Sequence, residues 1–241
     1  MTALFDLRQV SVRFGQVQAL QSVNLQVLPG HRLALVGANG SGKSTLLRVL
    51  NGLITASSKC LQGQMTVDPD VRQAMLFQRP YMLRMSALSN VALGLWLKGT
   101  PWALAKTRAL DALDRVGLLE QAVRPAKTLS MGQQQRLAFA RALAQQPNVL
   151  LLDEPTASMD PHAKREVEAL MHDFASSKNE KPMTLIFASH NLGQVKRLAT
   201  HVAYLEHGRL LAHLPVEDFF DAEKLHSTSP EADAFLKGEI I

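Results

Sequence analysis

The chain is poor in the residues that build disulfide frameworks and membrane anchors. Cys60 is its single cysteine, which excludes an internal disulfide and a cysteine-rich metal site. No apolar run approaches the ~20 residues that a membrane-spanning helix needs. Residues 1–6 lack the basic start and the long apolar core of a signal peptide. These absences predict a cytoplasmic protein.

Aromatic residues are also scarce, at 5% of the 241 residues, and the basic residues form no run. The net charge of +5 therefore reflects a solvated surface with a modest bias, and we infer no nucleic-acid partner from it. Hydrophobic residues make up 46% and charged residues 20%, as in an ordinary globular protein. This length suits one large domain or two small ones.

One glycine-rich segment indicates what the protein binds. It matches the pattern G-x-x-x-x-G-K-[ST], whose backbone N–H groups cradle nucleotide phosphates. The apolar residues 33–36 before it predict a buried strand, and the apolar residues of 46–50 recur at helical spacing. Lys43 can place its ammonium on the β- and γ-phosphates, and the Ser44 hydroxyl can bind Mg²⁺. The segment consists of Gly37, Ala38, Asn39, Gly40, Ser41, Gly42, Lys43, Ser44 and Thr45.

The remaining pattern predicts an α/β protein. Short alternating runs at residues 4–8, 10–14 and 23–27 predict an antiparallel sheet near the N-terminus. Helices are expected at residues 101–116, with Thr100 as N-cap, and at about 132–145. The apolar runs 149–152 and 184–188 predict buried strands, and their alternation with helices predicts a mainly parallel sheet.

Two acids follow the buried run 149–152, where open α/β sheets place their binding sites. Asp153 can hold Mg²⁺ through water. Glu154 points differently and can orient or deprotonate an attacking water. In a chain with a phosphate loop, these acids predict a hydrolytic site rather than a pair of surface charges.

The segment around Ser130 carries a family resemblance. Residues 128–136 read T-L-S-M-G-Q-Q-Q-R and resemble the LSGGQ signature of the ATP-binding cassette (ABC) ATPases. The signature lies between the phosphate loop and Asp153, as in that family. Met131 replaces the first signature glycine. We expect activity to survive this change, because the family tolerates variation there more than at Ser130 or Gly132.

Other positions extend the resemblance over essentially the whole chain. Phe14 matches the aromatic residue that stacks on adenine, although tyrosine is more usual there. Gln78 matches the glutamine that touches Mg²⁺ or water and moves with the transmembrane partner. Ser158 and Asp160 resemble the D-loop, and His190 matches the switch histidine that contacts the γ-phosphate.

The resemblance implies a P-loop NTPase fold: a RecA-like core with an N-terminal antiparallel β subdomain and an inserted α-helical subdomain. Residues 1–241 would form one ABC ATPase domain. Its core would span residues 1–85 and 147–215, its helical subdomain residues 86–146, and its helical tail residues 216–241.

The resemblance also implies a head-to-tail homodimer with two ATP molecules and Mg²⁺ between the subunits. One subunit would supply catalytic and nucleotide-binding residues, and the other would supply the signature. The expected catalytic residues are Lys43, Gln78, Glu154 and His190; the Mg²⁺ ligands Ser44, Gln78 and Asp153; the signature contacts Ser130, Gly132 and Gln133, with Asp160 near the interface.

Because the chain has no membrane segment, transport would need two separate permease subunits, and a substrate-binding protein would act indirectly. The cassette would lie at the cytoplasmic side of the membrane. Residues 77–86 lie where the coupling helix of a permease docks, but their apolar side chains could equally pack within the helical subdomain. Residues 77–95 and the tail at 229–239 are similar to cassettes of tungstate importers, and more loosely to those for phosphate. A cassette for another substrate, such as molybdate or an amino acid, or a non-transport ATPase such as an Fe–S assembly cassette, stays open.

Overall fold

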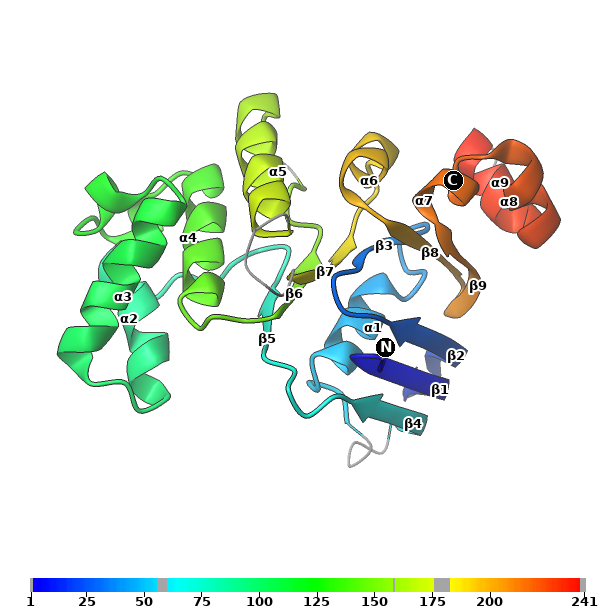
Figure 1. Ribbon diagram of the computed structural model, residues 1–241, viewed down its shortest axis with the longest axis horizontal. Helices are drawn as coiled ribbons and strands as arrows, with labels where there is room; N and C mark the ends of the chain where they lie inside the picture. The colour runs from blue at the N-terminus through cyan, green and yellow to red at the C-terminus, as the bar shows by residue number, and fades with distance from the viewer. Residues whose placement is uncertain (1, 56–59, 158, 176–182, 239–241) are drawn as a thin grey trace.

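The computed structural model describes residues 2–55, 60–157, 159–175 and 183–238, and it contains two β-sheets (Figure 1). The smaller sheet is antiparallel with strand order β2-β1-β4. The larger sheet has the order β5-β6-β7-β3-β8-β9, and all its neighbours are parallel except β8 and β9. These sheets confirm the expected α/β fold with a mainly parallel core sheet. The strands are β1 Phe5–Phe14, β2 Val17–Val27, β3 Arg32–Val36, β4 Leu61–Val67, β5 Gln73–Leu76, β6 Val149–Asp153, β7 Thr184–Ala188, β8 His201–Glu206 and β9 Arg209–Pro215.

The helices surround the larger sheet. Figure 1 shows α2, α3 and α4 together at one end, α5 and α6 above the sheet, and α8 and α9 at the other end. The α-helices are α1 Lys43–Leu50, α2 Ala87–Leu97, α3 Trp102–Arg115, α4 Met131–Leu143, α5 Pro161–Ala175, α6 Leu192–Leu198, α7 Val216–Phe219, α8 Ala222–Thr228 and α9 Pro230–Lys237. Short 3₁₀ helices lie at Leu119–Gln121 and Ala126–Thr128.

Two apolar cores lie on opposite faces of the parallel sheet. Along β6, Leu150 and Leu152 face the core shared with α2 to α6, whereas Val149 and Leu151 face the core shared with α1 and the antiparallel sheet. Since successive strand residues point to opposite faces, a strand covered on both faces has to be apolar throughout. This explains why the uninterrupted apolar runs predicted the central strands correctly.

The structure corrects two local expectations. The runs 4–8 and 10–14 form one strand, β1, whose pairing shifts around Gln9, a residue with φ 49°. Opposite it, a Cβ on Gly63 would lie 2.4 Å from the Gln9 carbonyl oxygen, so the bulge needs a glycine there. Helix α3 begins one residue later than expected: Pro101, not Thr100, is the N-cap, and its carbonyl accepts the Ala105 N–H.

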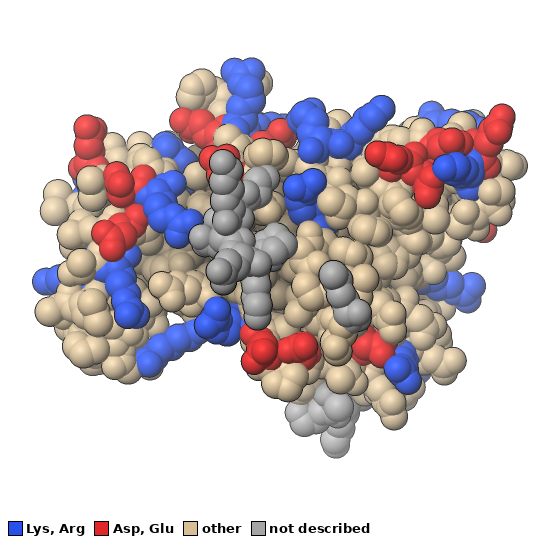
Figure 2. Space-filling view, viewed as in Figure 1, with Lys and Arg blue, Asp and Glu red and all other residues tan. Residues whose placement is uncertain are grey.

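The surface carries charges of both signs. On the face drawn in Figure 2, Lys and Arg side chains are interspersed with Asp and Glu, and acidic side chains gather over α8 and α9. Within the described residues, no helix combines the length and the apolar character needed to cross a membrane.

Candidate functional site

The phosphate loop joins β3 to α1 at the carboxyl end of the parallel sheet. Its glycines are required by crowding as well as by conformation. A Cβ on Gly37 would lie 2.0 Å from the backbone oxygen of Leu205, and one on Gly42 would lie 2.7 Å from that of Ala19. Gly42 also has φ 108° and caps α1 without a side-chain hydrogen bond. The helix therefore begins with no side chain bonded to its N-terminus, as an anion site requires.

Lys43 is the first residue of α1 and is 5% exposed. Its Nζ donates to the carbonyl oxygens of Gly37 at 2.8 Å and Ala38 at 2.9 Å. Burial lowers the pKa of Lys43, and the carboxylates of Glu154 and Asp153 oppose that shift. The lysine is thus folded over its own loop and can exchange backbone oxygens for phosphate oxygens.

Ser44 and Asp153 bring together the ligand types that Mg²⁺ prefers. The Ser44 hydroxyl donates to Asp153 Oδ1 at 2.8 Å, and Asp153 is 6% exposed at the end of β6. Among the described residues, no group of three or more His, Cys, Asp and Glu could hold a metal ion. Two oxygen ligands fit Mg²⁺ nevertheless, because that ion is usually bound by one or two protein groups together with substrate phosphates and water.

Glu154 lies at the centre of a second set of contacts. Its Oε1 is paired with His190 Nε2, and its Oε2 accepts a hydrogen bond from Gln78 Nε2 at 3.1 Å. Its φ of 47° is uncommon for a residue with a side chain. Asp153 and Ala188 are register partners in β6 and β7, so the loops after these strands start side by side. The sheet therefore unites residues that are far apart in sequence.

The signature segment forms a separate cluster with the start of α5. Ser130 Oγ accepts the Gln133 N–H at 3.3 Å, and Gln133 Oε1 accepts the Ser130 N–H at 3.0 Å, which makes a capping box for α4. A Cβ on Gly132 would lie 3.0 Å from Ala163 Cβ. Asp160 Oδ1 accepts the N–H groups of His162 and Ala163, and these backbone bonds lower the pKa of Asp160.

Two expected residues stand apart. Phe14 ends β1 and is 44% exposed, on a strand of the antiparallel sheet rather than on the parallel sheet that carries the phosphate loop. Ser158 lies outside the described residues. Among the described residues, no hydrogen bond or ion pair joins the signature cluster to Lys43 or Glu154. This cluster consists of Ser130, Gly132, Gln133 and Asp160.

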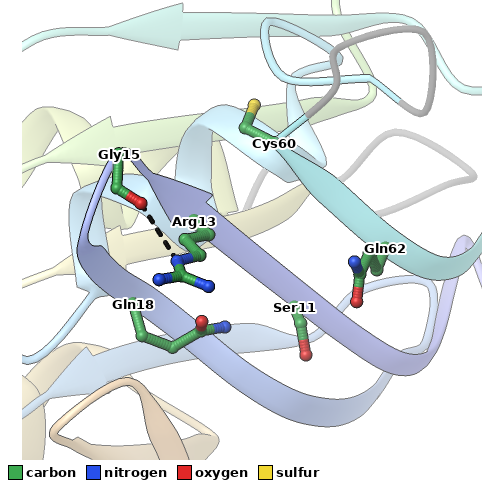
Figure 3. A pocket seen from close by; sticks show the side chains of 6 residues that line it. All are labelled: Ser11, Arg13, Gly15, Gln18, Cys60 and Gln62. Atoms are coloured by element: carbon green, nitrogen blue, oxygen red, sulfur yellow. Dashed lines mark hydrogen bonds between the residues drawn. The ribbon is translucent and has the colours of Figure 1, made fainter.

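A pocket of about 520 Å³ opens beside the end of β1 (Figure 3). Ser11 and Arg13 line it and alternate along β1 with the buried Val10 and Val12. The pocket therefore lies on the face of the antiparallel sheet that points away from α1. It is a different place from the phosphate loop. Its other lining residues are Gly15, Gln18, Cys60 and Gln62.

Gln194 on α6 is a fully buried polar residue that the sequence did not single out, and it lies beside the loops that carry Glu154 and His190. It lies four residues before the buried Leu198, so helical spacing puts both on the inward face of the helix. This spacing was the sequence feature that could have identified Gln194 as buried.

The geometry defines the class of protein: a phosphate loop with a buried lysine, a Ser–Asp pair and a carboxylate at the strand end are the parts of a P-loop nucleotide hydrolase. Residues 20–157 match the family model described as ABC transporter. The chain belongs to this family, as an ABC ATPase cassette that uses ATP.

Known relatives cover most of the chain. It is 36% identical over 218 residues to "Glutamine transport ATP-binding protein GlnQ" of Escherichia coli, which covers 86% of this chain and 89% of that protein. It is 39% identical over 238 residues to "Phosphonates import ATP-binding protein PhnC 3" of a Nostoc species, covering 91% and 90%. A solved structure titled as the dimeric, post-hydrolysis state of the cassette MJ0796 bound to ADP and Pi matches with a TM-score of 0.76, 26% identity and coverage of 88% and 98%.

Proposed function

We propose that this chain hydrolyses ATP between two copies of itself to drive import through separate permease subunits. The observation that carries the proposal is the division of the expected site into two clusters within one chain. One cluster has the phosphate-binding and hydrolytic groups, and the other has an exposed helix start. A head-to-tail pair would place the second cluster of each copy opposite the first cluster of the other.

Within one copy we assign the following roles. Lys43 and the N–H groups of residues 37–45 bind phosphate, and Ser44, Asp153 and Gln78 hold Mg²⁺, which neutralises charge on the phosphates when bound. Glu154 orients and deprotonates the attacking water. His190 holds Glu154 and contacts the γ-phosphate. Phe14, exposed at the end of β1, stacks on adenine.

The other copy supplies the signature. The Ser130 hydroxyl keeps its own proton free to donate, since its oxygen is the acceptor in the capping box. Gly132 lies against Ala163, so the start of α4 sits beside the start of α5, where Asp160 would reach the interface. Support for the pairing comes from the MJ0796 cassette, whose solved structure is described as dimeric.

We propose a peripheral position at the cytoplasmic side of the membrane, against two permease subunits, with a substrate-binding protein acting indirectly. Phe77 and Tyr81 are 44% and 72% exposed, and both line a groove of about 420 Å³ between the sheet and α4. This exposure favours docking over internal packing as the role of residues 77–86. We further propose that residues 86–146, between β5 and β6, act as the inserted helical subdomain, and residues 216–241 as the tail.

For the transported solute we propose an oxyanion, with tungstate as the specific candidate. The sequence of residues 77–95 and the tail support tungstate, and the phosphonate importer among the relatives supports the oxyanion class. A second candidate is an amino acid, because the glutamine transport protein is a comparably similar relative.

The hydrolytic roles are tested with the Glu154→Gln variant. We expect it to bind ATP like the wild type, to hydrolyse ATP at least about a hundredfold more slowly, and to run as a dimer on gel filtration with ATP and Mg²⁺. The wild type should dimerise only transiently. Normal turnover in Glu154→Gln would contradict the assignment of the hydrolytic residue.

The solute is tested in cells that lack this chain and in cells complemented with it. Tungsten and molybdenum are measured by elemental mass spectrometry after feeding trace amounts of both oxyanions, and uptake of labelled glutamine is measured in parallel. Loss of tungsten that is restored by the wild type but not by Glu154→Gln supports the proposal. Unchanged metal with lost glutamine uptake would move the assignment to an amino acid. No change in any of them, and no association with a permease, would favour a cassette outside transport.

A further inference from the structure

Gln194 occupies a buried position between the two loops that carry Glu154 and His190. Its side chain is 0% exposed, on the first turn of α6. Three side chains from different elements bond to it. Ser189 Oγ donates to Gln194 Oε1 at 2.7 Å, and Gln194 Nε2 donates to Thr156 Oγ1 at 3.1 Å and to Glu168 Oε1 at 3.3 Å.

These partners flank the reacting residues. Ser189 directly precedes His190, and Thr156 follows Glu154 by two residues. The hydroxyl of Ser189 also accepts the Asn191 N–H at 3.0 Å, so the loop is held on both sides of His190. One amide group therefore joins the loop after β6 to the loop after β7.

Burial makes these bonds consequential. Ser189 is 5% exposed and Thr156 7%, so neither hydroxyl could easily replace the amide with water. A buried polar group that loses its partner carries its full desolvation cost, and the loops would shift to relieve it. A displacement of about 1 Å at a catalytic group can cost on the order of a hundredfold in rate.

We infer that Gln194 is a positioning residue for ATP hydrolysis: it fixes His190 against Glu154 by bonding to both of their loops. This inference rests on the roles proposed above for Glu154 and His190. Gln194 acts through these loops, and among the described residues no hydrogen bond joins its side chain to the phosphate loop. Its loss should therefore lower kcat and leave ATP affinity nearly unchanged.

The orientation of the amide allows a charge-swap test. In Gln194→Glu, a carboxylate would face the Glu168 carboxylate at the present distance of 3.3 Å, and the two would repel each other. Adding Glu168→Gln returns an amide donor to that pair, while the hydroxyls of Ser189 and Thr156 can donate to the new carboxylate. We expect Gln194→Glu to lower kcat about a hundredfold and the double variant to recover to within about fivefold of the wild type.

Arg197→Ala is the matched control. The Arg197 side chain is 59% exposed and pairs with the same Glu168 at 2.7 Å, but among the described residues no hydrogen bond or ion pair joins it to Gln194 or to either loop. Its removal should leave kcat within about twofold of the wild type. Each variant is measured for kcat, for ATP affinity by equilibrium binding, and for Tm.

The outcomes separate the inference from the proposed function. A lowered kcat with unchanged ATP affinity in Gln194→Glu, rescued by Glu168→Gln, supports the positioning role. Wild-type kcat in a folded Gln194→Glu overturns it, as does a lowered Tm with no change in kcat. If Gln194→Glu does not fold, Ser189→Ala decides: we expect about a tenfold fall in kcat, and an unchanged kcat overturns the inference. If the wild type shows no Glu154-dependent hydrolysis, the proposed function itself fails.

Discussion

The phosphate loop and the signature segment both sit at the start of a helix, but their helix ends differ. At α1, Gly42 is the N-cap and no side chain bonds to the helix end. At α4, Ser130 and Gln133 cap each other through two hydrogen bonds. The first helix start has donors available for an anion, and the second is an ordinary capped helix when the chain is alone.

The difference shows which part of the site a single chain completes by itself. Around α1, Lys43 bonds to the backbone of its own loop, Ser44 bonds to Asp153, and Glu154 pairs with His190, all within one chain. Around α4, the capping box already uses the Ser130 oxygen. The Ser130 hydroxyl proton and the exposed surface of the helix start are left to bind a phosphate on another copy. Three predictions test this contrast and one tests stability away from both helix starts, in order from the largest expected effect to the smallest.

Lys43→Ala removes the cation of the phosphate loop and should have the largest effect. We expect at least about a hundredfold loss of ATP turnover and a clear loss of ATP affinity, because a buried cation is removed from the phosphate site. Phosphate release and equilibrium nucleotide binding are the measurements. Lys106→Ala, at a lysine over the Trp102 ring on α3, is the control and should behave as the wild type. Unchanged binding in Lys43→Ala would refute the phosphate-loop assignment.

Ser130→Ala should weaken hydrolysis without weakening the binding of ATP to one copy. We expect about a tenfold fall in turnover, and a loss of about 1 kcal/mol in the free energy of unfolding from the missing cap. Ser229→Ala is the matched control, since Ser229 Oγ caps α9 by accepting the Ala232 N–H. It should lower stability similarly and leave turnover intact. Equal turnover in the two variants would mean that Ser130 is only a cap.

Acid should destabilise the fold at a place away from both helix starts. His31 precedes β3, its ring stacks on His201 at 4.0 Å, and His213 lies next to them on β9, with Asp6 and Arg8 beside it. Burial lowers the pKa of His213 from 6.5 to about 4, and His201 and His31 add to that shift.

Because folding lowers the pKa of His213, keeping this histidine neutral contributes to the free energy of unfolding. That contribution is complete above pH 6.5 and is lost as the pH falls towards 4. His213 is nevertheless an exposed residue of β9, and water screens the effect, so we expect a loss of only about 1 kcal/mol, or roughly 2–4 °C in Tm. His213→Gln should flatten the dependence of Tm on pH between 7.5 and 5, whereas His172→Gln, at an exposed histidine of α5, should keep it. A wild-type Tm that rises on acidification would contradict this account.

Met131→Gly restores the first glycine of the signature and should have the smallest effect. Met131 is 52% exposed at the first position of α4 and makes no part of the capping box. We expect turnover to stay within about threefold and stability to fall by about 0.5–1 kcal/mol, from the added backbone freedom. Steady-state hydrolysis and chemical unfolding measure the two quantities. A change of more than tenfold in turnover would show that the methionine tunes the phosphate contact.

The sequence predicted what local patterns determine. The run 184–188 became β7 with the same limits, and the run 149–152 became β6, because strands buried on both faces must be apolar throughout. It did not predict that Glu154 would lie against His190, since that contact follows from β6 and β7 being neighbours in the sheet. The role of Gln194 was not predicted for a related reason: its spacing from Leu198 indicates an inward position, but its partners Ser189 and Thr156 come together only when β6 and β7 are neighbours.

The central claim is that the signature of one copy completes the phosphate site of another, and mixing two inactive variants tests it most directly. Lys43→Ala and Ser130→Arg are purified separately and then mixed in equal amounts with ATP. Mixed pairs contain one intact site, so random pairing should restore about a quarter of wild-type hydrolysis. A chain carrying both substitutions, mixed with Lys43→Ala, forms no intact site and serves as the control. Activity no greater than the sum of the two variants alone would contradict the claim.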